Sequence, residues 1–260
     1  MSAIIRPKEA YLEQTAKNME KYFQLPDWTP QQKVALTCRI LAAEGHESGL
    51  AGQITARGPR PDTYWMLSFG LGFDEAQASN IVLCDGDLNL LEGSGFVNPS
   101  NRFHLWIYRH RPQVNAIVHT HPPYVSALSL TGQPLKVSHM DTTMFHEDCA
   151  WLPEWPGVPV GDEEGRIINE ALGDKKAILL AHHGQLVATD TIEGAAQLAV
   201  FIERAARMQV LAQSIGEIKP INAEFAKEAH DYRLKPKATA ATFHYFARRV
   251  LKREGDEVLD

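Results

Sequence analysis

Apolar and polar positions alternate along this chain with two periodicities, one typical of helices and the other typical of strands. A threonine cap at Thr29, a proline in the first turn and a glutamine at the third helical position predict a helix start, and apolar residues keep helical spacing up to Ala42. Asp190 and Thr191 predict a second capped start, ahead of a long amphipathic helix. Helices are also expected near the N-terminus, over about 100–110 and 122–130, and through most of the C-terminal segment.

Short apolar runs bounded by turn residues predict strands. One strand follows the glycine turn at Gly49 and runs to Arg57, and the others are expected at 64–67, 80–84, 88–91, 115–120, 177–181 and 185–188. Strands in the middle of the chain, with helices before, between and after them, predict an α/β domain built in layers. The expected organisation is an N-terminal helical arm (1–28), one domain (29–215) and a C-terminal helical extension (216–260).

Two histidines stand at the end of one predicted strand, directly before a pair of prolines. In a strand, residues two apart point to the same face, so His119 and His121 present both imidazoles on one side of the sheet. Their Cα atoms lie roughly 6–7 Å apart in that geometry, a separation that one divalent metal bridges. Another strand end carries His182 and His183, of which only one faces the same site because neighbouring strand residues point in opposite directions. The alternative is a set of structural histidines at strand ends.

Composition narrows the class of protein. The chain has 260 residues, 44% of them apolar, which is enough for the core of one large or two small domains. A net charge of −6 and a pI of about 6.0 predict no nucleic-acid partner. No apolar run approaches the roughly 20 residues of a membrane span, so no membrane partner is expected. Three scattered cysteines predict a reducing compartment, and we expect a soluble cytoplasmic protein.

Four motifs stand in a specific order along the chain: Ala51–Arg57, Arg102-Phe103-His104, Val118–Pro122 and His183-Gly184. Together they resemble the class II aldolase/adducin family over roughly residues 30–215. The resemblance implies a three-layer α/β/α sandwich with a mostly antiparallel central sheet, in a homotetramer with active sites between subunits. It also implies a small-molecule substrate and a divalent metal ion. Zinc is the first choice, with manganese or iron as other options, and the implied ligands are His119, His121 and His183.

The chain departs from the family's sugar-phosphate aldolases at two places. Those enzymes have a glutamate four residues before the histidine of Arg-Phe-His, whereas this chain has Ser100, whose hydroxyl cannot replace a carboxylate in proton transfer at neutral pH. At the positions that resemble the phosphate pocket stand Gln53, Phe69-Gly70 and Asn98-Pro99. The phenylalanine and the proline remove hydroxyl and amide donors from that pocket. The resemblance is therefore to branches without the catalytic glutamate and the phosphate pocket, and it implies a non-phosphorylated substrate.

Several residues are further candidates for the site. A guanidinium at a strand end, that of Arg57, suits a substrate carboxylate, although an exposed salt bridge is an equally good interpretation. Asp141 and His146 lie in a polar cluster from which a replacement acid or base is expected, and each is otherwise a solvated loop residue. The expected substrate-binding residues are Gly52, Gln53, Ser100 and Arg102, where the glycine serves a tight turn just as well.

The leading functional hypothesis is a metal-dependent lyase that cleaves a C–C bond of a non-phosphorylated keto or hydroxy acid in aldolase fashion, through a metal-stabilised enolate. One alternative is a decarboxylase of an aromatic or hydroxy carboxylate, towards which the missing glutamate points. Another alternative is a non-haem iron oxygenase on the same scaffold. An adducin-like scaffold without catalysis is the last, and the retained histidines argue against it.

Overall fold

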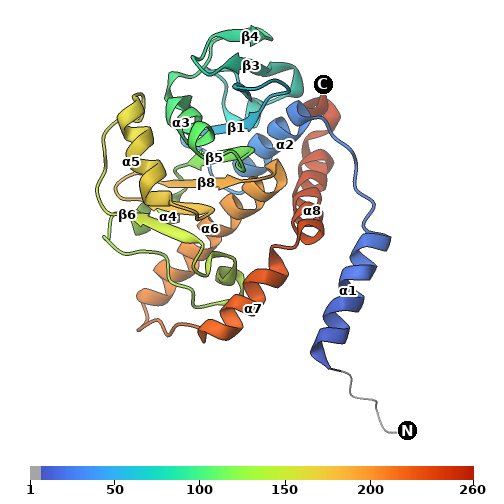
Figure 1. Cartoon of the computed structure of the whole chain (residues 1–260), viewed down its shortest axis with the longest axis vertical. Coiled ribbons are helices and arrows are strands. Elements are labelled where there is room, and N and C mark those ends of the chain that lie inside the picture. Colours follow the sequence, from blue (N-terminus) through green and yellow to red (C-terminus); the bar gives the residue numbers. More distant parts are fainter. Residues whose placement is uncertain (1–6) are drawn as a thin grey trace.

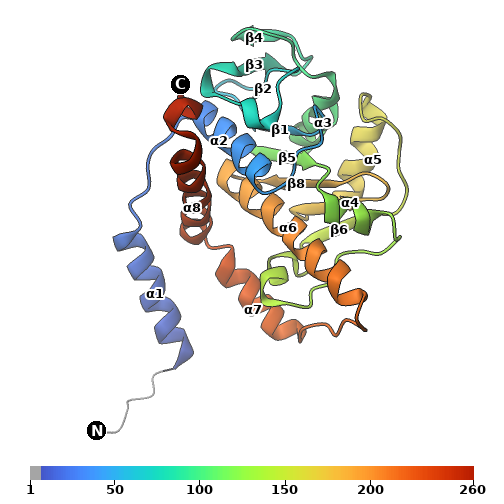
Figure 2. The same ribbon diagram turned by 180° about the vertical axis from the view of Figure 1, so that it is seen from behind.

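The computed structural model describes residues 7–260, and its centre is a single twisted sheet (Figures 1 and 2). The strands are β1 Gln53–Arg57, β2 Thr63–Leu67, β3 Ile81–Asp85, β4 Leu90–Glu92, β5 Ala116–Thr120, β6 Cys149–Leu152, β7 Ala177–Leu180 and β8 Gln185–Thr189. Their order across the sheet is β4-β3-β2-β1-β5-β8-β7-β6. Every neighbouring pair is antiparallel except β6 and β7, which run parallel. The expected mostly antiparallel sheet is confirmed.

Helices cover both faces of this sheet. One face carries α2 Pro30–Ala43, α6 Ile192–Gln213 and α8 Pro236–Glu254, and the other carries α3 Arg102–His110 and α5 Asp162–Leu172. Strand β5 shows why, because Val118 faces the core under α2 and α6, whereas its neighbour Ile117 faces the core under α3 and α5. Within residues 7–260, no helix combines the length and the apolar character needed to cross a bilayer.

The predicted helix starts are confirmed by their capping contacts. The Thr29 hydroxyl accepts a hydrogen bond from the Gln32 backbone amide (3.2 Å), and the Gln32 side chain accepts one from the Thr29 amide (3.0 Å). Thr191 caps α6 by accepting from the amide of Gly194 at 3.1 Å. These short-range contacts involve residues within three positions of each other, which is why sequence alone predicts them.

Two elements that follow β5 in the chain, β6 and α5, were not expected from the sequence. Strand β6 has only four residues, too few for a clear periodic pattern. Helix α5 contains Gly165, a residue that disfavours helices in sequence-based interpretation. The structure explains this glycine: a Cβ there would lie 2.7 Å from the Cβ of Trp106, so its absence lets α5 pack closely against α3.

The N-terminal helix α1 (Lys8–Tyr22) lies beside α8 and away from the sheet, and it has no buried residue (Figures 1 and 2). Residues 1–6 of the expected arm lie outside the described residues. In contrast, the C-terminal segment 216–260 contributes to the core, where Phe243 and Ala247 of α8 are fully buried with residues of α2 and α6. The expected C-terminal extension therefore packs as part of the main body.

Candidate metal centre

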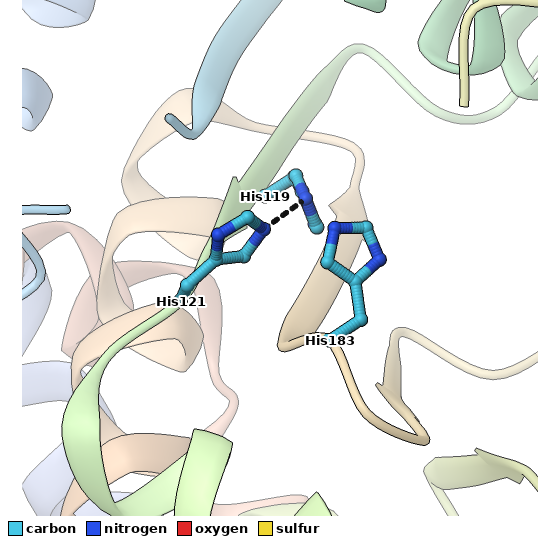
Figure 3. A group of neighbouring side chains, drawn as sticks. All are labelled: His119, His121 and His183. Carbon is cyan, nitrogen blue, oxygen red and sulfur yellow. Dashed lines mark hydrogen bonds between the residues drawn. The ribbon is translucent and has the colours of Figure 1, made fainter. Parts of the chain in front are cut away.

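Three imidazole rings converge at one end of the sheet, on the face covered by α3 and α5 (Figure 3). His119 lies in β5, His121 directly follows this strand, and His183 lies in the turn between β7 and β8. Their ring centroids are 4.5–4.7 Å apart, and one nitrogen of each ring lies within 4.8 Å of the others. The adjacent His182 is exposed, with a φ of 55°, and is not part of this group.

A glycine makes this convergence possible. Gly184 follows His183 in the turn that passes over the end of β5. A Cβ at Gly184 would lie 2.4 Å from the carbonyl oxygen of Thr120 and 2.7 Å from Cδ2 of His121, closer than any carbon contact allows. Any side chain at this position would therefore push the turn away from β5, and His183 with it.

Hydrogen bonding and burial leave the three rings in the form that binds metals. Nδ1 of His119 lies 2.7 Å from the backbone carbonyl oxygen of Gln185, to which it donates, so Nε2 carries the lone pair that faces the other rings. Nε2 of His121 lies 2.9 Å from Nε2 of His119. Burial, with the neighbouring rings adding to it, holds the pKa of His119 well below its usual value. Burial also lowers the pKa of His121, and it lowers that of His183 to about 4.

This donor set fits a divalent cation. Three neutral imidazole nitrogens suit zinc, iron or manganese, and three protein ligands leave a coordination position free for water or substrate. The Gln185 carbonyl oxygen, which accepts the hydrogen bond from His119 Nδ1, is the kind of outer partner that orients a metal-binding histidine.

A cavity of about 390 Å³ opens above the histidines. Three of the four expected substrate-binding residues line it, namely Gly52, Gln53 and Ser100. The remaining lining residues are Leu50, Ala51, Phe69, Asn98, Pro99, Trp155, Val158 and Pro159, together with the three histidines. Among the described residues, no lysine, arginine, aspartate or glutamate lines this pocket.

Gln53 and Gly52 have different roles at the pocket wall. Gln53 is paired with His119 across β1 and β5, so both side chains lie on the same face of the sheet. Its side-chain Oε1 is buried and accepts no hydrogen bond from the described residues. Gly52 has a φ of 102°, and a Cβ there would lie 3.1 Å from the carbonyl oxygen of His119. The backbone therefore requires glycine at position 52.

The two candidate arginines do not reach the pocket. Arg57 lies at the other end of β1, where Nε donates to the carbonyl oxygen of Val114 and Nη2 to that of Tyr108, both at 2.7 Å. Its guanidinium thus binds backbone at the C-terminal end of α3, and the expectation that it lies at the substrate site is wrong for this chain's own pocket. Arg102 faces Asp162 at 3.7 Å and does not line the pocket.

Asp141 and His146 also lie elsewhere. They belong to the short 3₁₀ helix η4 (Met140–Phe145) and its end, which pack against α6 on the opposite face of the sheet. Although burial opposes it, ion pairs with Arg204 and Arg233 hold the pKa of Asp141 below its usual value. Within one chain, neither residue is placed to exchange a proton with a ligand above the histidines.

The sequence interpretation missed four residues that line the pocket. Leu50 lies between Gly49 and Gly52 in the turn before β1, and Trp155, Val158 and Pro159 belong to the loop between β6 and α5. The sequence did contain a signal for the loop residues. The segment 151–160 is rich in apolar residues and prolines and lies between two charged segments, 146–148 and 162–164, which is unusual for a loop that only connects elements.

The fold and the site together define a class of protein: an antiparallel sheet between helices, with three histidines under a pocket at a strand end. Comparison with known proteins supports the same class. The sequence model of the "Class II Aldolase and Adducin N-terminal domain" family matches residues 32–210, and this chain belongs to that family.

Three known proteins illustrate the similarity. The 4-hydroxy-3-prenylphenylpyruvate oxygenase/4-hydroxy-3-prenylbenzoate synthase of Streptomyces roseochromogenus subsp. oscitans is 32% identical, over 74% of this chain and 71% of that protein. Decarboxylase NovR of Streptomyces niveus is also 32% identical, over 80% of this chain and 82% of that protein. The solved structure of L-fuculose 1-phosphate aldolase from Glaciozyma antarctica PI12 superimposes with a TM-score of 0.83 at 27% identity, covering 91% and 97% of the two chains. The relatives are enzymes, which is consistent with a lyase-type enzyme here.

Proposed function

We propose that the protein is a metal-dependent lyase that cleaves a C–C bond of a non-phosphorylated keto or hydroxy acid in aldolase fashion. The observation that carries this proposal is the convergence of His119, His121 and His183 under a pocket whose described lining includes no lysine, arginine, aspartate or glutamate. His119, His121 and His183 would hold a divalent cation there, zinc by preference, and this cation would supply Lewis-acid stabilisation for the negative charge that bond cleavage develops. Phe69 and Pro99 line the pocket in place of hydroxyl and amide donors, and no lysine or arginine is among the described lining residues, which disfavours a phosphate group.

The chain's own residues bind and orient the substrate. Gln53, whose side chain lies on the same face of the sheet as His119, forms part of the pocket wall beside the reacting end of the substrate. The Ser100 hydroxyl, at the pocket wall, orients a substrate oxygen but does not act as a general base at neutral pH. The apolar remainder of the lining excludes water from the reacting end of the substrate.

A second candidate function is decarboxylation of an aromatic or hydroxy carboxylate. Two observations favour it: the described lining residues include Ser100 but no carboxylate, and a decarboxylase is among the relatives that are 32% identical. Loss of CO₂ leaves the same kind of charge as aldol cleavage but needs no base to remove a hydroxyl proton. Analysis of the products separates the two, since decarboxylation releases CO₂ and aldol cleavage releases two carbonyl fragments.

The test is a screen of keto acids and aromatic acids with metal analysis on the same sample. We expect turnover that is lost after chelation and restored by Zn²⁺, Mn²⁺ or Fe²⁺, and that continues without oxygen. Turnover that stops under anaerobic conditions would replace the lyase by an iron oxygenase. Less than about one tenth of a metal per subunit, unrecovered by added metal, would favour a non-catalytic scaffold.

We also propose that the protein is a homotetramer, as the family resemblance implies. A partner subunit could then supply the acid or base that is absent from this chain's pocket, and Asp141 and His146 remain proposed sources of it. Light scattering coupled to size-exclusion chromatography measures the assembly directly.

A further inference from the structure

One side of the histidine pocket is formed by apolar side chains that are open to solvent. We call Phe69, Trp155, Val158 and Pro159 the apolar wall. Trp155 is 51% exposed, Val158 60% and Phe69 39%, whereas the chain's other four tryptophans are buried or half-buried. Large apolar groups exposed together beside a cavity mark a surface that binds something.

The apolar wall is held in place before any ligand arrives. Trp155, Val158 and Pro159 lie on the loop between β6 and α5, in which prolines at 153, 156 and 159 restrict the backbone. Phe69 is held by Phe96, whose carbonyl oxygen accepts a hydrogen bond from the Phe69 amide at 2.7 Å and whose ring packs edge-on against the Phe69 ring at 5.7 Å. A wall ordered in advance loses little conformational entropy on binding.

The pocket lining therefore combines two chemically different groups. One is the set of three imidazole rings, from the end of β5 and the turn between β7 and β8. The other is the apolar wall, and among the described lining residues there is no lysine, arginine, aspartate or glutamate. A small aliphatic acid bound at the imidazole rings would leave the apolar wall in water.

We propose that the substrate carries an uncharged aromatic ring that lies against the apolar wall while its acid end faces the histidines, and that Trp155 determines this specificity. The inference rests on the function proposed above and names the substrate class of the same site. Contact with a ring removes apolar surface of both partners from water, and the indole adds a stacking preference for flat groups.

Isothermal titration calorimetry of the zinc-loaded full-length protein tests this, with phenylpyruvate and pyruvate as probes that differ by the ring. We expect phenylpyruvate to bind at least about tenfold more tightly than pyruvate. Trp155→Ala is expected to reduce that ratio about tenfold while pyruvate affinity and zinc content stay unchanged. Trp155→Phe retains a ring and most of the preference.

Two further variants make the result specific. Val158→Glu places a charge in the apolar wall and is expected to weaken phenylpyruvate binding more than pyruvate binding. Phe225→Ala is the matched control, because Phe225 is 64% exposed on α7 (Ala223–Arg233) and lies outside the pocket, so no effect is expected.

The outcomes separate this inference from the proposed function. Equal affinity of the wild type for both probes, or a ratio unchanged in Trp155→Ala, overturns the aromatic specificity and leaves the lyase proposal standing. Failure of the zinc-loaded wild type to bind either acid overturns both. Equal weakening of both probes by Trp155→Ala assigns the residue a general structural role and also overturns the inference.

Discussion

The Nδ1 atom of His119 lies 2.7 Å from the backbone carbonyl oxygen of Gln185, the residue that begins the neighbouring strand β8. The same Gln185 sends its side chain to the other face of the sheet, where Nε2 donates to the Thr120 hydroxyl at 2.8 Å. That hydroxyl also lies 3.0 Å from Nδ1 of the buried His46. The strand end under the candidate metal centre is thus fixed from both faces, and the orientation of the His119 ring depends on main-chain geometry that few side-chain changes can alter.

Removal of one candidate ligand should remove the metal while the fold survives. His121 is half-buried and follows the end of β5, so His121→Ala leaves the core intact. Since loss of an outer partner of a metal ligand costs about 10–100-fold in affinity, we expect the loss of a ligand to cost more than about 100-fold. Metal analysis and circular dichroism measure the two properties. His182→Ala, at an exposed neighbouring position, is the control, and wild-type metal content in His121→Ala would contradict the assignment.

The glycine after His183 should be as important as the ligand itself. Gly184→Ala places a methyl group against the Thr120 carbonyl and the His121 ring, so the turn must move and the ligands separate. We expect metal affinity to fall by more than about tenfold, together with a lower thermal midpoint. Gly216→Ala is the matched control, because a Cβ there meets nothing within 4 Å. If Gly184→Ala binds metal as tightly as the wild type, the turn does not position His183.

Arg57 should matter for stability and not for substrate binding. Arg57→Met removes charged hydrogen bonds to the carbonyl oxygens of Val114 and Tyr108, and we expect the free energy of unfolding to fall by about 2–3 kcal/mol. Urea denaturation measures this change, and calorimetry should show unaltered affinity for keto acids. Arg60→Met, at an exposed ion pair with Glu92, should change stability by less than about 0.5 kcal/mol. A weakened substrate affinity in folded Arg57→Met would restore the carboxylate-binding interpretation.

The stability contributed by His230 should depend on pH. Hydrogen bonds from its ring to Asp148 (3.2 Å) and Asp231 (2.9 Å) raise its pKa in the folded protein, with burial and Lys176 opposing them. A raised pKa stabilises the fold fully below the unfolded value of about 6.5, and this stabilisation is lost as the pH rises through the folded value.

The corresponding measurement compares the wild type with His230→Gln by urea denaturation between pH 5.5 and 9. We expect the variant to be less stable by about 0.5–1 kcal/mol near the acidic limit, with the difference shrinking towards the alkaline one. The burial of His119, His183 and the other neutral histidines is common to both proteins and cancels in the difference. A difference that grows with pH would contradict the assigned direction of the shift.

The sequence by itself determined the features that depend on neighbours along the chain. The caps at Thr29 and Thr191 involve residues at most three positions apart, and the pairing of His119 with His121 on one face follows from the two-residue period of a strand. The order of motifs was sufficient to place the chain in its family. The approach of His183 followed from the family resemblance and not from spacing, since it lies more than 60 residues further along the chain.

Only the tertiary structure decided which of the candidate residues lie together at the histidine pocket. Arg57 lies in the same strand as Gln53, yet one binds the end of α3 and the other lines the pocket, because they occupy opposite ends of β1. Asp141 lies on the opposite face of the sheet from the three histidines. Trp155 reaches the pocket because β6 runs parallel to β7, so the loop after β6 begins at the same end of the sheet as the turn that carries His183. These outcomes depend on strand order and crossover direction, which are set by long-range packing and leave no local pattern in the sequence.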